Sequence, residues 1–226
     1  MPKKFFSRGK TMIEAIIIII FAFLLGGIPS GLLIAKRYGI DIRTVGSCNT
    51  GATNVTRCVG KGPGIFCFVC DFLKGAIPVF AAMKFSPLSW VAIAAFAAAV
   101  AGHMFPVYLK FKGGKGVATA AGGAFAIAPL PLLAALLIWY AVFRISRYVS
   151  LASIIAAVAL PLGALVLRIF CNPVSAPFYL RVQTVTVIAF AVIGALAVYR
   201  HRSNIVRLLN GTESRFEKSA VPDKGR

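Results

Sequence analysis

Six long apolar segments constrain the fold of this 226-residue chain more than any other feature of its sequence. A helix needs about 20 apolar residues to cross the hydrocarbon core of a bilayer, and five of the six segments fit one such span each. Because 59% of the residues are hydrophobic and only 14% are charged, a water-soluble monomer is excluded. We therefore predict an all-α integral membrane protein. The segments cover approximately residues 12–35, 64–82, 86–106, 117–142, 149–170 and 182–199.

The fourth segment decides the number of spans, because it is the longest and is interrupted by Pro129 and Pro131. Proline has no amide N–H, so a helix is expected to end or kink there. If this segment crosses the membrane once, the two sides hold 14 and 10 Lys and Arg residues, and if it crosses twice they hold 17 and 7. The positive-inside rule favours the second arrangement. We expect about seven transmembrane helices, some short or broken, with the N-terminus outside and the C-terminus in the cytoplasm.

The distribution of charge along the chain indicates its domain organisation and its kind of partner. A single multi-span domain is expected over residues 12–210, with a basic tail at 1–11 and a polar tail at 211–226. The excess of 25 Lys and Arg over 6 Asp and Glu is expected in loops that face anionic headgroups or substrates. The apolar bulk argues against nucleic acid as a partner.

Cys67 and Cys70 form a C-x-x-C pair without a second pair or a histidine cluster, which favours apolar packing. We predict no metal and no cofactor.

The first polar stretch, residues 45–57, is rich in glycine and in small hydrogen-bonding side chains. Glycine permits a close approach of the backbone to a ligand, and the hydroxyl and amide groups can bind its oxygens. On its own, this stretch is explained equally well as an ordinary turn-rich loop. Its candidate site residues are Ser47, Asn49, Thr53, Asn54 and Arg57.

The second polar stretch, residues 102–119, contains a glycine-rich loop that leads directly into an apolar helix. Such a loop presents backbone N–H groups and a helix N-terminus to an anion, and Lys115 adds a full positive charge. The spacing does not match a P-loop, because Gly116 follows the lysine. We predict phosphate binding here, and a flexible basic hinge is the alternative. The candidate residues are Lys110, Gly113, Gly114, Lys115 and Gly116.

The third polar stretch, residues 199–213, follows the last apolar segment. At helical spacing Arg200, Asn204 and Arg207 share one face, and His201 and Asn204 share a neighbouring one. Taken alone, an arginine-rich helix end is usually a headgroup anchor. Glu213 closes the stretch.

Two further polar pairs lie near these stretches. Asp71 and Lys74 are three residues apart within one apolar segment, a spacing that favours a structural ion pair facing the bundle interior. Arg147 and Ser150 begin another segment. With seven spans, this second pair and all three polar stretches lie on one side of the membrane. None of them offers a Ser-His-Asp triad, paired carboxylates or a metal set. They offer groups that hold phosphates and hydroxyls at the edge of an apolar cavity.

The three polar stretches resemble the motifs of the PlsY family, the membrane-bound acyl-phosphate:glycerol-3-phosphate acyltransferases of bacteria. The resemblance is carried by GSCNTGATNVTR at 46–57, GHMFPVYLKFKGGKGVAT at 102–119 and RHRSNIVRLLNGTE at 200–213, and it covers almost the whole chain. Residues 28–31 and 147–151 are also similar. The chain departs from the family pattern at Cys48, where glycine is common, which reshapes the first stretch if that position needs a positive φ.

This resemblance implies transfer of a fatty acyl group from acyl phosphate to the 1-hydroxyl of glycerol 3-phosphate, giving lysophosphatidic acid and phosphate. It implies seven transmembrane helices in the inner (cytoplasmic) membrane, an active site that faces the cytoplasm, and delivery of the donor by the acyl-phosphate synthase. Ser47, Arg57, His201 and Asn204 are expected in catalysis, and Glu213, Asp71 and Lys74 in structural roles. The expected substrate-binding residues are Asn49, Thr53, Asn54, Lys110, Gly113, Gly114, Lys115, Gly116, Ser150 and Arg200.

Two questions stay open at this point. A transporter for phosphate or glycerol 3-phosphate would also use cations, glycine loops and many spans, although the clustering of the polar stretches on one side argues against it. The proton of the attacking hydroxyl passes either to the phosphate of the donor or to His201 acting as a general base.

Overall fold

The structure, a computed structural model, describes residues 3–171 and 182–216, and every regular element within these residues is helical. The predicted all-α class is therefore confirmed. The elements are α1 (Lys3–Gly27), α2 (Ser30–Lys36), α3 (Ala52–Cys58), α4 (Lys61–Phe85), α5 (Trp90–Met104), the 3-10 turn η1 (Val107–Leu109), α6 (Val117–Ile127), α7 (Pro129–Ser146), α8 (Val149–Phe170), α9 (Thr184–Arg200) and α10 (Arg202–Leu209).

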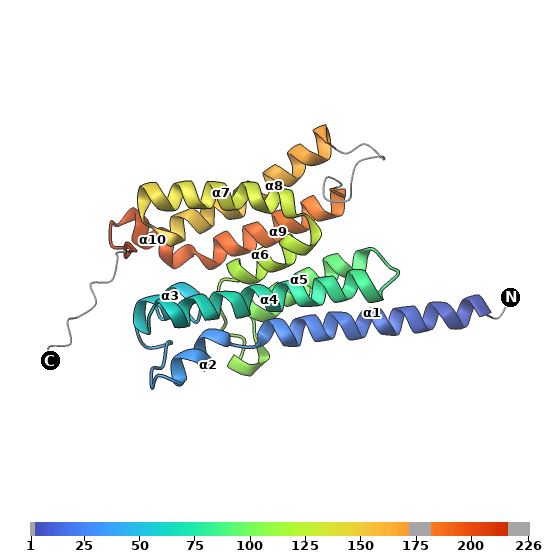
Figure 1. The fold of residues 1–226 in the computed structure, drawn as a ribbon, viewed down its shortest axis with the longest axis horizontal. Coiled ribbons are helices and arrows are strands. Elements are labelled where there is room, and N and C mark those ends of the chain that lie inside the picture. The colour runs from blue at the N-terminus through green and yellow to red at the C-terminus, as the bar shows by residue number, and fades with distance from the viewer. Residues whose placement is uncertain (1–2, 172–181, 217–226) are drawn as a thin grey trace.

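Within the described residues, five helical stretches are long and apolar enough to cross a membrane. The pair α9 and α10 also passes this test when taken together, although the two helices meet at a bend of 56°. At 1.5 Å per residue, the 11 residues of α6 are about 17 Å long, which is roughly half of a hydrocarbon core. Figure 1 shows α1, α4, α5, α6, α7, α8 and α9 running back and forth along the same bundle axis, with α6 as the short member.

The fourth apolar segment is split at the position that the prolines predicted. α6 ends at Ile127, Ala128 is non-helical with φ −150° and ψ 82°, and α7 begins at Pro129. Proline fits this place because the first turn of a helix needs no amide N–H. The chain reverses direction there (Figure 1), so the predicted break into two arms is confirmed, whereas α6 is too short to count as a candidate span by itself.

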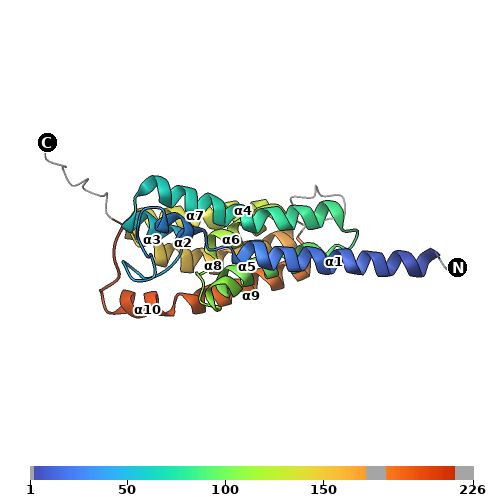
Figure 2. The same ribbon diagram turned by 90° about the horizontal axis from the view of Figure 1, so that it is seen from below.

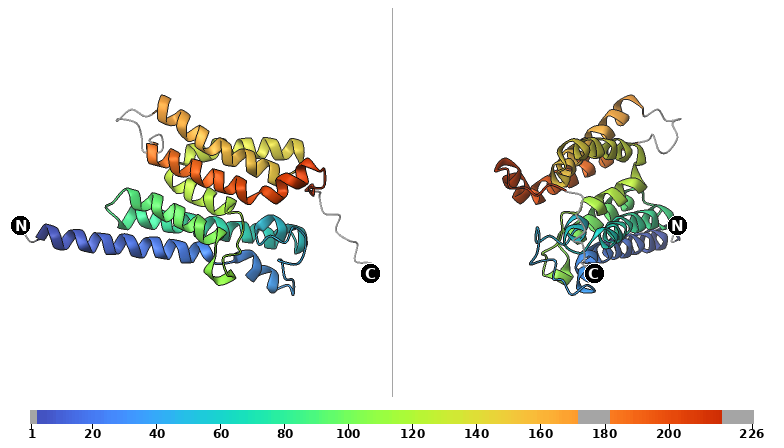
Figure 3. Two further views of the ribbon diagram at one scale, coloured as in Figure 1. Left: turned by 180° about the vertical axis from the view of Figure 1, so that it is seen from behind. Right: turned by 60° about the vertical axis from the view of Figure 1, so that its left-hand side comes forward.

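The helices form two layers, with α1, α4 and α5 in one and α7, α8 and α9 in the other (Figures 1 and 3). α6 lies between them and contacts α4, α5, α7 and α9. Phe96 of α5 and Phe190 of α9 are fully buried and meet edge to face at 5.6 Å, which joins the layers. α4 and α6 touch through their backbones: an ideal Cβ on Gly75 would lie 2.0 Å from the Thr119 carbonyl oxygen. Small residues allow this close helix packing in membranes.

Both expected tails contain ordered structure. The helix α1 begins at Lys3, although its apolar span starts only at Thr11. Residues 211–216 return to the bundle, where the Phe216 N–H donates to the Arg147 carbonyl at 2.9 Å. The first six residues of the expected polar tail therefore lie against the bundle.

The polar stretches gather towards one end of the bundle. In Figures 1 and 2, α2, α3, α10 and the α7–α8 junction lie at the end opposite to the start of α1. The α4–α5 connection beside Lys84 and the end of α8 beside Arg168 lie at the other end. Among the described residues, the basic segments 36–61, 144–147 and 200–216 therefore lie on the same side of the molecule.

Candidate functional site

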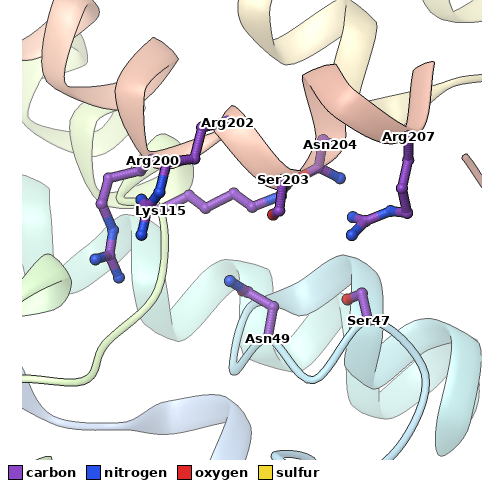
Figure 4. Close-up of a pocket in the computed structure, with 8 residues that line it drawn as sticks. All are labelled: Ser47, Asn49, Lys115, Arg200, Arg202, Ser203, Asn204 and Arg207. Carbon is purple, nitrogen blue, oxygen red and sulfur yellow. Dashed lines mark hydrogen bonds between the residues drawn. The ribbon is translucent and has the colours of Figure 1, made fainter. Parts of the chain in front are cut away.

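Residues from all three polar stretches line one small cavity of about 200 Å³. Figure 4 shows the Lys115 side chain extending towards Asn204, with Ser47 and Asn49 on the loop across the cavity. The cavity is therefore assembled from segments that lie far apart in the sequence. Its lining residues are Ser47, Asn49, Lys115, Arg200, Arg202, Ser203, Asn204 and Arg207.

A larger cavity of about 330 Å³ begins at the same place and continues between the two layers. It shares Ser47, Asn49, Lys115 and Asn204 with the small cavity. Its apolar walls come from α6, α7, α8 and α9, with Phe68 of α4 as a further member. The small cavity, with Lys115 and the arginines of the third stretch, forms a polar, cationic mouth to this larger apolar space. Such a space suits a ligand with a charged head and a hydrocarbon chain. The apolar walls include Leu132, Leu136, Trp139, Ala156, Leu160, Phe190 and Ile193.

The buried side chain of Asn54 organises the first polar stretch. Its Nδ2 donates to the carbonyls of Ile42, Val45 and Asn49 at 3.2, 3.1 and 3.0 Å, and its Oδ1 accepts the Ser47 N–H at 2.9 Å. One side chain therefore contacts four backbone groups, with the two N–H groups of Nδ2 shared among three carbonyls. The polar atoms of Asn54 are used within the loop, and the loop in turn presents Ser47 and Asn49 to the cavity.

The departure from the family pattern in this stretch lies at a strained position. Cys48 has φ +55°, and Gly46, two residues earlier, has φ +60°. The left-handed region disfavours a residue with a Cβ atom. The position does need a positive φ, and the chain adopts it with a cysteine.

The glycines of the second polar stretch are used for packing. The Gly113 N–H donates to the Met104 carbonyl at 3.2 Å, and the Gly114 N–H donates to the His103 carbonyl at 3.1 Å. An ideal Cβ on Gly114 would lie 2.2 Å from His103 Nε2. These two amides therefore do not act as the anion donors that the sequence predicted, because they pair with carbonyls at the end of α5.

The residues of this stretch that face the larger cavity lie slightly later in the chain. Gly116, with φ +79°, turns the backbone into α6, and Gly116, Val117 and Ala118 line the larger cavity. The first N–H groups of a helix have no partner within it and carry the positive end of its dipole. Burial lowers the pKa of Lys115 to about 8, against the attraction of the Glu213 carboxylate. Lys115 Nζ donates a short hydrogen bond to Asn204 Oδ1.

Glu213 ties the third polar stretch together. It accepts hydrogen bonds of 2.7 Å each from Ser150 Oγ, Asn204 Nδ2 and Arg207 Nε. Burial alone would raise the pKa of Glu213, but these hydrogen bonds and the Arg207 charge outweigh it and lower the pKa. The carboxylate thus fixes Asn204, whose other amide atom meets Lys115. Ser150 takes part through Glu213 and also lines the larger cavity.

Arg200 and His201 sit where α9 gives way to α10. The Arg200 guanidinium donates to the carbonyls of Gly113 at 2.6 Å and Gly114 at 3.0 and 3.1 Å, which clamps the second stretch to α9. His201 Nδ1 lies 2.8 Å from the Ala197 carbonyl oxygen. Because a carbonyl only accepts, Nδ1 carries the proton and Nε2 keeps the lone pair. Burial and then the Lys115 charge lower the pKa of His201 to about 4, so the ring is neutral at neutral pH.

Of the remaining residues predicted from the sequence, some line the larger cavity and others line neither cavity. Thr53 and Arg57 line only the larger cavity, whereas Lys110 is exposed, with φ +50°, and lines neither cavity. The Asp71–Lys74 ion pair is present and buried, with 2.7 Å between Oδ1 and Nζ.

Sequence reasoning missed several residues of the site. Arg202, Ser203 and Arg207 line the small cavity, and His103 lines the larger one. The helical spacing of Arg200, Asn204 and Arg207 was a usable signal for Arg207. Within the part of the chain that the structure describes, no three His, Cys, Asp or Glu side chains are placed to hold a metal ion.

Comparison with known proteins gives consistent matches. Residues 16–211 match the family model described as glycerol-3-phosphate acyltransferase. The chain is 49% identical over 204 residues to the glycerol-3-phosphate acyltransferase of Aquifex aeolicus, covering 90% of this chain and all of that one. It is 47% identical over 209 residues to the enzyme of the same name from Geotalea daltonii, covering 92% of this chain and all of that one.

Two solved structures are also similar. One is the crystal structure of PlsY, an integral membrane glycerol 3-phosphate acyltransferase, in its glycerol 3-phosphate form, with a TM-score of 0.79. The other is the lysophosphatidic acid form, with a TM-score of 0.76. Each is 47% identical and covers 90% of this chain and 96% of the other.

Proposed function

The chain belongs to the glycerol-3-phosphate acyltransferase family, and on this premise we propose that it transfers a fatty acyl group from acyl phosphate to the 1-hydroxyl of glycerol 3-phosphate. The products are lysophosphatidic acid and phosphate, and the reaction is the first acylation step of phospholipid synthesis. The protein is an integral membrane enzyme, and the relatives give the transporter alternative no support.

One observation carries the proposal: a cationic mouth assembled from three separate stretches opens into an apolar cavity. Lys115, the arginines of the third stretch and the first turn of α6 attract phosphate groups to the mouth. The apolar walls of α7, α8 and α9 accept the hydrocarbon chain of the donor. Both substrates carry a phosphate group and one carries an alkyl chain, so the two halves of the cavity match the pair.

The chemistry asks mainly for positioning and charge stabilisation. Acyl phosphate is already an activated donor, so holding the acceptor hydroxyl against its carbonyl carbon converts the step into an intramolecular one. The C–O bond to the new ester forms as the C–O bond to phosphate breaks. Lys115 and the amides at the start of α6 are placed to stabilise the negative charge that develops. Ser47, on the loop across the mouth from Lys115, and Arg57, which lines the larger cavity, supply further hydrogen-bond donors.

We assign the proton of the attacking hydroxyl to the departing phosphate. His201 Nε2 has a lone pair, but a ring with a pKa of about 4 is a weak base. A phosphate oxygen, with a second pKa of about 6, is the stronger acceptor. The His201→Gln variant is expected to keep kcat within about tenfold of the parent. A collapse of kcat with unchanged KM values would assign the base to His201 instead.

The direct test is an assay of the purified protein in detergent with palmitoyl phosphate and glycerol 3-phosphate. We expect lysophosphatidic acid and one equivalent of phosphate, with no product when palmitoyl-CoA replaces palmitoyl phosphate. The Lys115→Met variant serves as the matched negative control. Product from palmitoyl-CoA at an equal rate would contradict the donor assignment, and glycerol 3-phosphate uptake into proteoliposomes without any lysolipid would contradict acyl transfer.

We further propose that the mouth faces the cytoplasm from the inner membrane, where the acyl-phosphate synthase supplies the donor. The basic loops at this end of the bundle support that orientation. Native cysteines test it: Cys48 is exposed at this end, whereas Cys171 ends α8 at the other. With Cys48 as the sole cysteine, a membrane-impermeant maleimide should label inside-out vesicles and leave intact cells unlabelled. With Cys171 as the sole cysteine, the pattern should reverse.

A further inference from the structure

A buried ionic cluster joins three helices beside the cavity mouth, and the acyl transfer described above does not use it. The cluster consists of Asp71 and Lys74 on α4, His103 on α5 and Thr119 on α6, all of them buried. Asp71 Oδ1 lies 2.7 Å from Lys74 Nζ and 3.8 Å from His103 Nδ1. His103 Nδ1 lies 3.2 Å from Thr119 Oγ1.

Stability does not explain such a cluster. Removing two charges from water is expensive, and well-packed apolar residues often replace a buried ion pair without loss of stability. Ionisable groups inside a membrane bundle are costly for the same reason and usually have a functional role. The contacts of the cluster show which parts of the mouth it fixes in place.

Lys74 connects the cluster to the first polar stretch. Its Nζ donates to the Ile28 carbonyl at 2.8 Å, at the break between α1 and α2. α2 in turn rests directly on that stretch, because an ideal Cβ on Gly31 would lie 1.9 Å from the Thr50 carbonyl oxygen. The position of Ser47 therefore depends on where Lys74 holds this break.

His103 connects the cluster to the second polar stretch. Its carbonyl accepts the Gly114 N–H, its ring packs against the α-carbon of Gly114, and its Nδ1 meets Thr119 in the first turn of α6. Lys115 lies between Gly114 and that turn. The ring and backbone of His103 thus hold the segment that carries Lys115 from both of its ends.

The two stretches meet at the cluster itself. A void of about 10 Å³, with room for at most one water molecule, is lined by Ile28 at the helix break, Thr50 of the first stretch, Gly113 of the second, and Asp71 and His103 of the cluster. Asp71 and His103 also line the larger cavity. The cluster therefore lies between the two loops that form opposite walls of the mouth, and we call the contacts of Asp71, Lys74 and His103 with these loops the joint.

We propose that Asp71, Lys74 and His103 are positioning residues that set the spacing between Ser47 on the first stretch and Lys115 on the second. This inference rests on the proposed function, because only a ligand held by both stretches senses their spacing. Glycerol 3-phosphate is such a ligand along its whole length, whereas the donor is also held through its acyl chain by the apolar walls of α7, α8 and α9. Loosening this contact between the two stretches should therefore weaken binding of the acceptor far more than binding of the donor.

The test is the double variant Asp71→Asn/Lys74→Met, which removes the joint and leaves no unpaired buried charge. We expect a folded, monodisperse protein whose KM for glycerol 3-phosphate rises about tenfold, with the KM for palmitoyl phosphate within about twofold of the parent. KM does not depend on the amount of active enzyme, so a loss of folded protein alone cannot produce this result. Arg168→Met, which removes an ionisable side chain that donates to Thr184 at the far end of the bundle, is the matched control and should change neither KM.

His103→Gln leaves the ion pair intact and provides a second measurement if the double variant does not fold. The same selective rise in the KM for glycerol 3-phosphate is expected. A folded variant with an unchanged KM for glycerol 3-phosphate, or with equal rises for both substrates, would overturn the proposal, and so would loss of folding in both variants. If the parent itself makes no lysophosphatidic acid, the proposed function fails, which is a separate outcome.

Discussion

The first and second polar stretches look alike in sequence but are built in opposite ways. Both are glycine-containing loops that lead into a helix beside the cavity mouth. In the first, one side chain, Asn54, contacts four backbone groups. In the second, the backbone pairs with the end of α5, and Arg200 clamps it from outside.

As a result, glycine has a different structural role in each loop. In the first stretch Gly46 supplies a left-handed turn, and its neighbour Cys48 adopts one without being glycine. In the second stretch Gly113 and Gly114 are required because His103 leaves no room for a Cβ. Substitutions should therefore disable the second stretch through steric conflict and the first through lost hydrogen bonds.

The largest effect is expected at Gly114. Gly114→Ala would place a Cβ 2.2 Å from His103 Nε2, so the loop that carries Lys115 must move. A displacement of this kind should lower kcat/KM for glycerol 3-phosphate about 100-fold, as measured with palmitoyl phosphate as donor. Gly62→Ala is the control, because nothing lies within 4 Å of its ideal Cβ. Activity retained in Gly114→Ala would show that the glycine is not needed for packing.

A smaller but clear loss is expected at Asn54. Asn54→Asp keeps the shape of the side chain but removes the donors to three carbonyls and buries a charge among them. An unsatisfied buried group costs about 2 kcal/mol, which corresponds to a roughly 30-fold lower kcat/KM if the loop remains formed only part of the time. The melting temperature should fall as well. The exposed Asn210→Asp variant is the control, and equal behaviour of the two variants would contradict the role of Asn54.

The comparison also shows which features could be read from the sequence. The spans and the break at Pro129 could be predicted because apolar length and the missing proline N–H act locally. The gathering of the polar stretches followed from the count of basic residues. The partners of the Gly113 and Gly114 amides could not be predicted, because they depend on how the end of α5 packs against a loop.

Other parts of the site were hidden for the same reason. The return of Glu213 to Ser150, and the place of His103 against Thr119, join residues that lie far apart in the chain. Periodicity within one segment carries no information on such contacts. Lys110 shows the converse, since its place in a matching motif predicted a binding role and the structure leaves it exposed outside both cavities.

The pH dependence separates the two stretches further, because only the second contributes a titrating cation. A lysine is charged below its pKa, so with a pKa of about 8 the Lys115 cation is lost as the pH rises from 7 to 9. Glycerol 3-phosphate remains a dianion over this range, and its KM should rise about tenfold. Lys115→Arg keeps its charge and should flatten the profile. A flat profile in the parent would contradict phosphate binding by Lys115.

The smallest effect is expected at Cys48, where the first stretch carries its strain. Cys48→Gly removes the steric strain of the left-handed backbone but increases the conformational entropy of the unfolded chain. The free energy of unfolding is therefore expected to rise by at most about 1 kcal/mol. The melting temperature should rise by about 2–4 °C, with little change in activity. Cys58→Gly, within the helix α3, is the control and should lower it. A fall in both variants would show that the φ of Cys48 carries no strain.

The central claim is that the first and second stretches hold the same glycerol 3-phosphate molecule. A double-mutant cycle of Ser47→Ala and Lys115→Met tests it most directly, with calorimetric binding of glycerol 3-phosphate to the purified protein as the readout. We predict that the two losses are not additive, with a coupling free energy of about 1 kcal/mol or more. Additivity within about 0.3 kcal/mol would mean that the two side chains do not share a ligand, and would contradict the account.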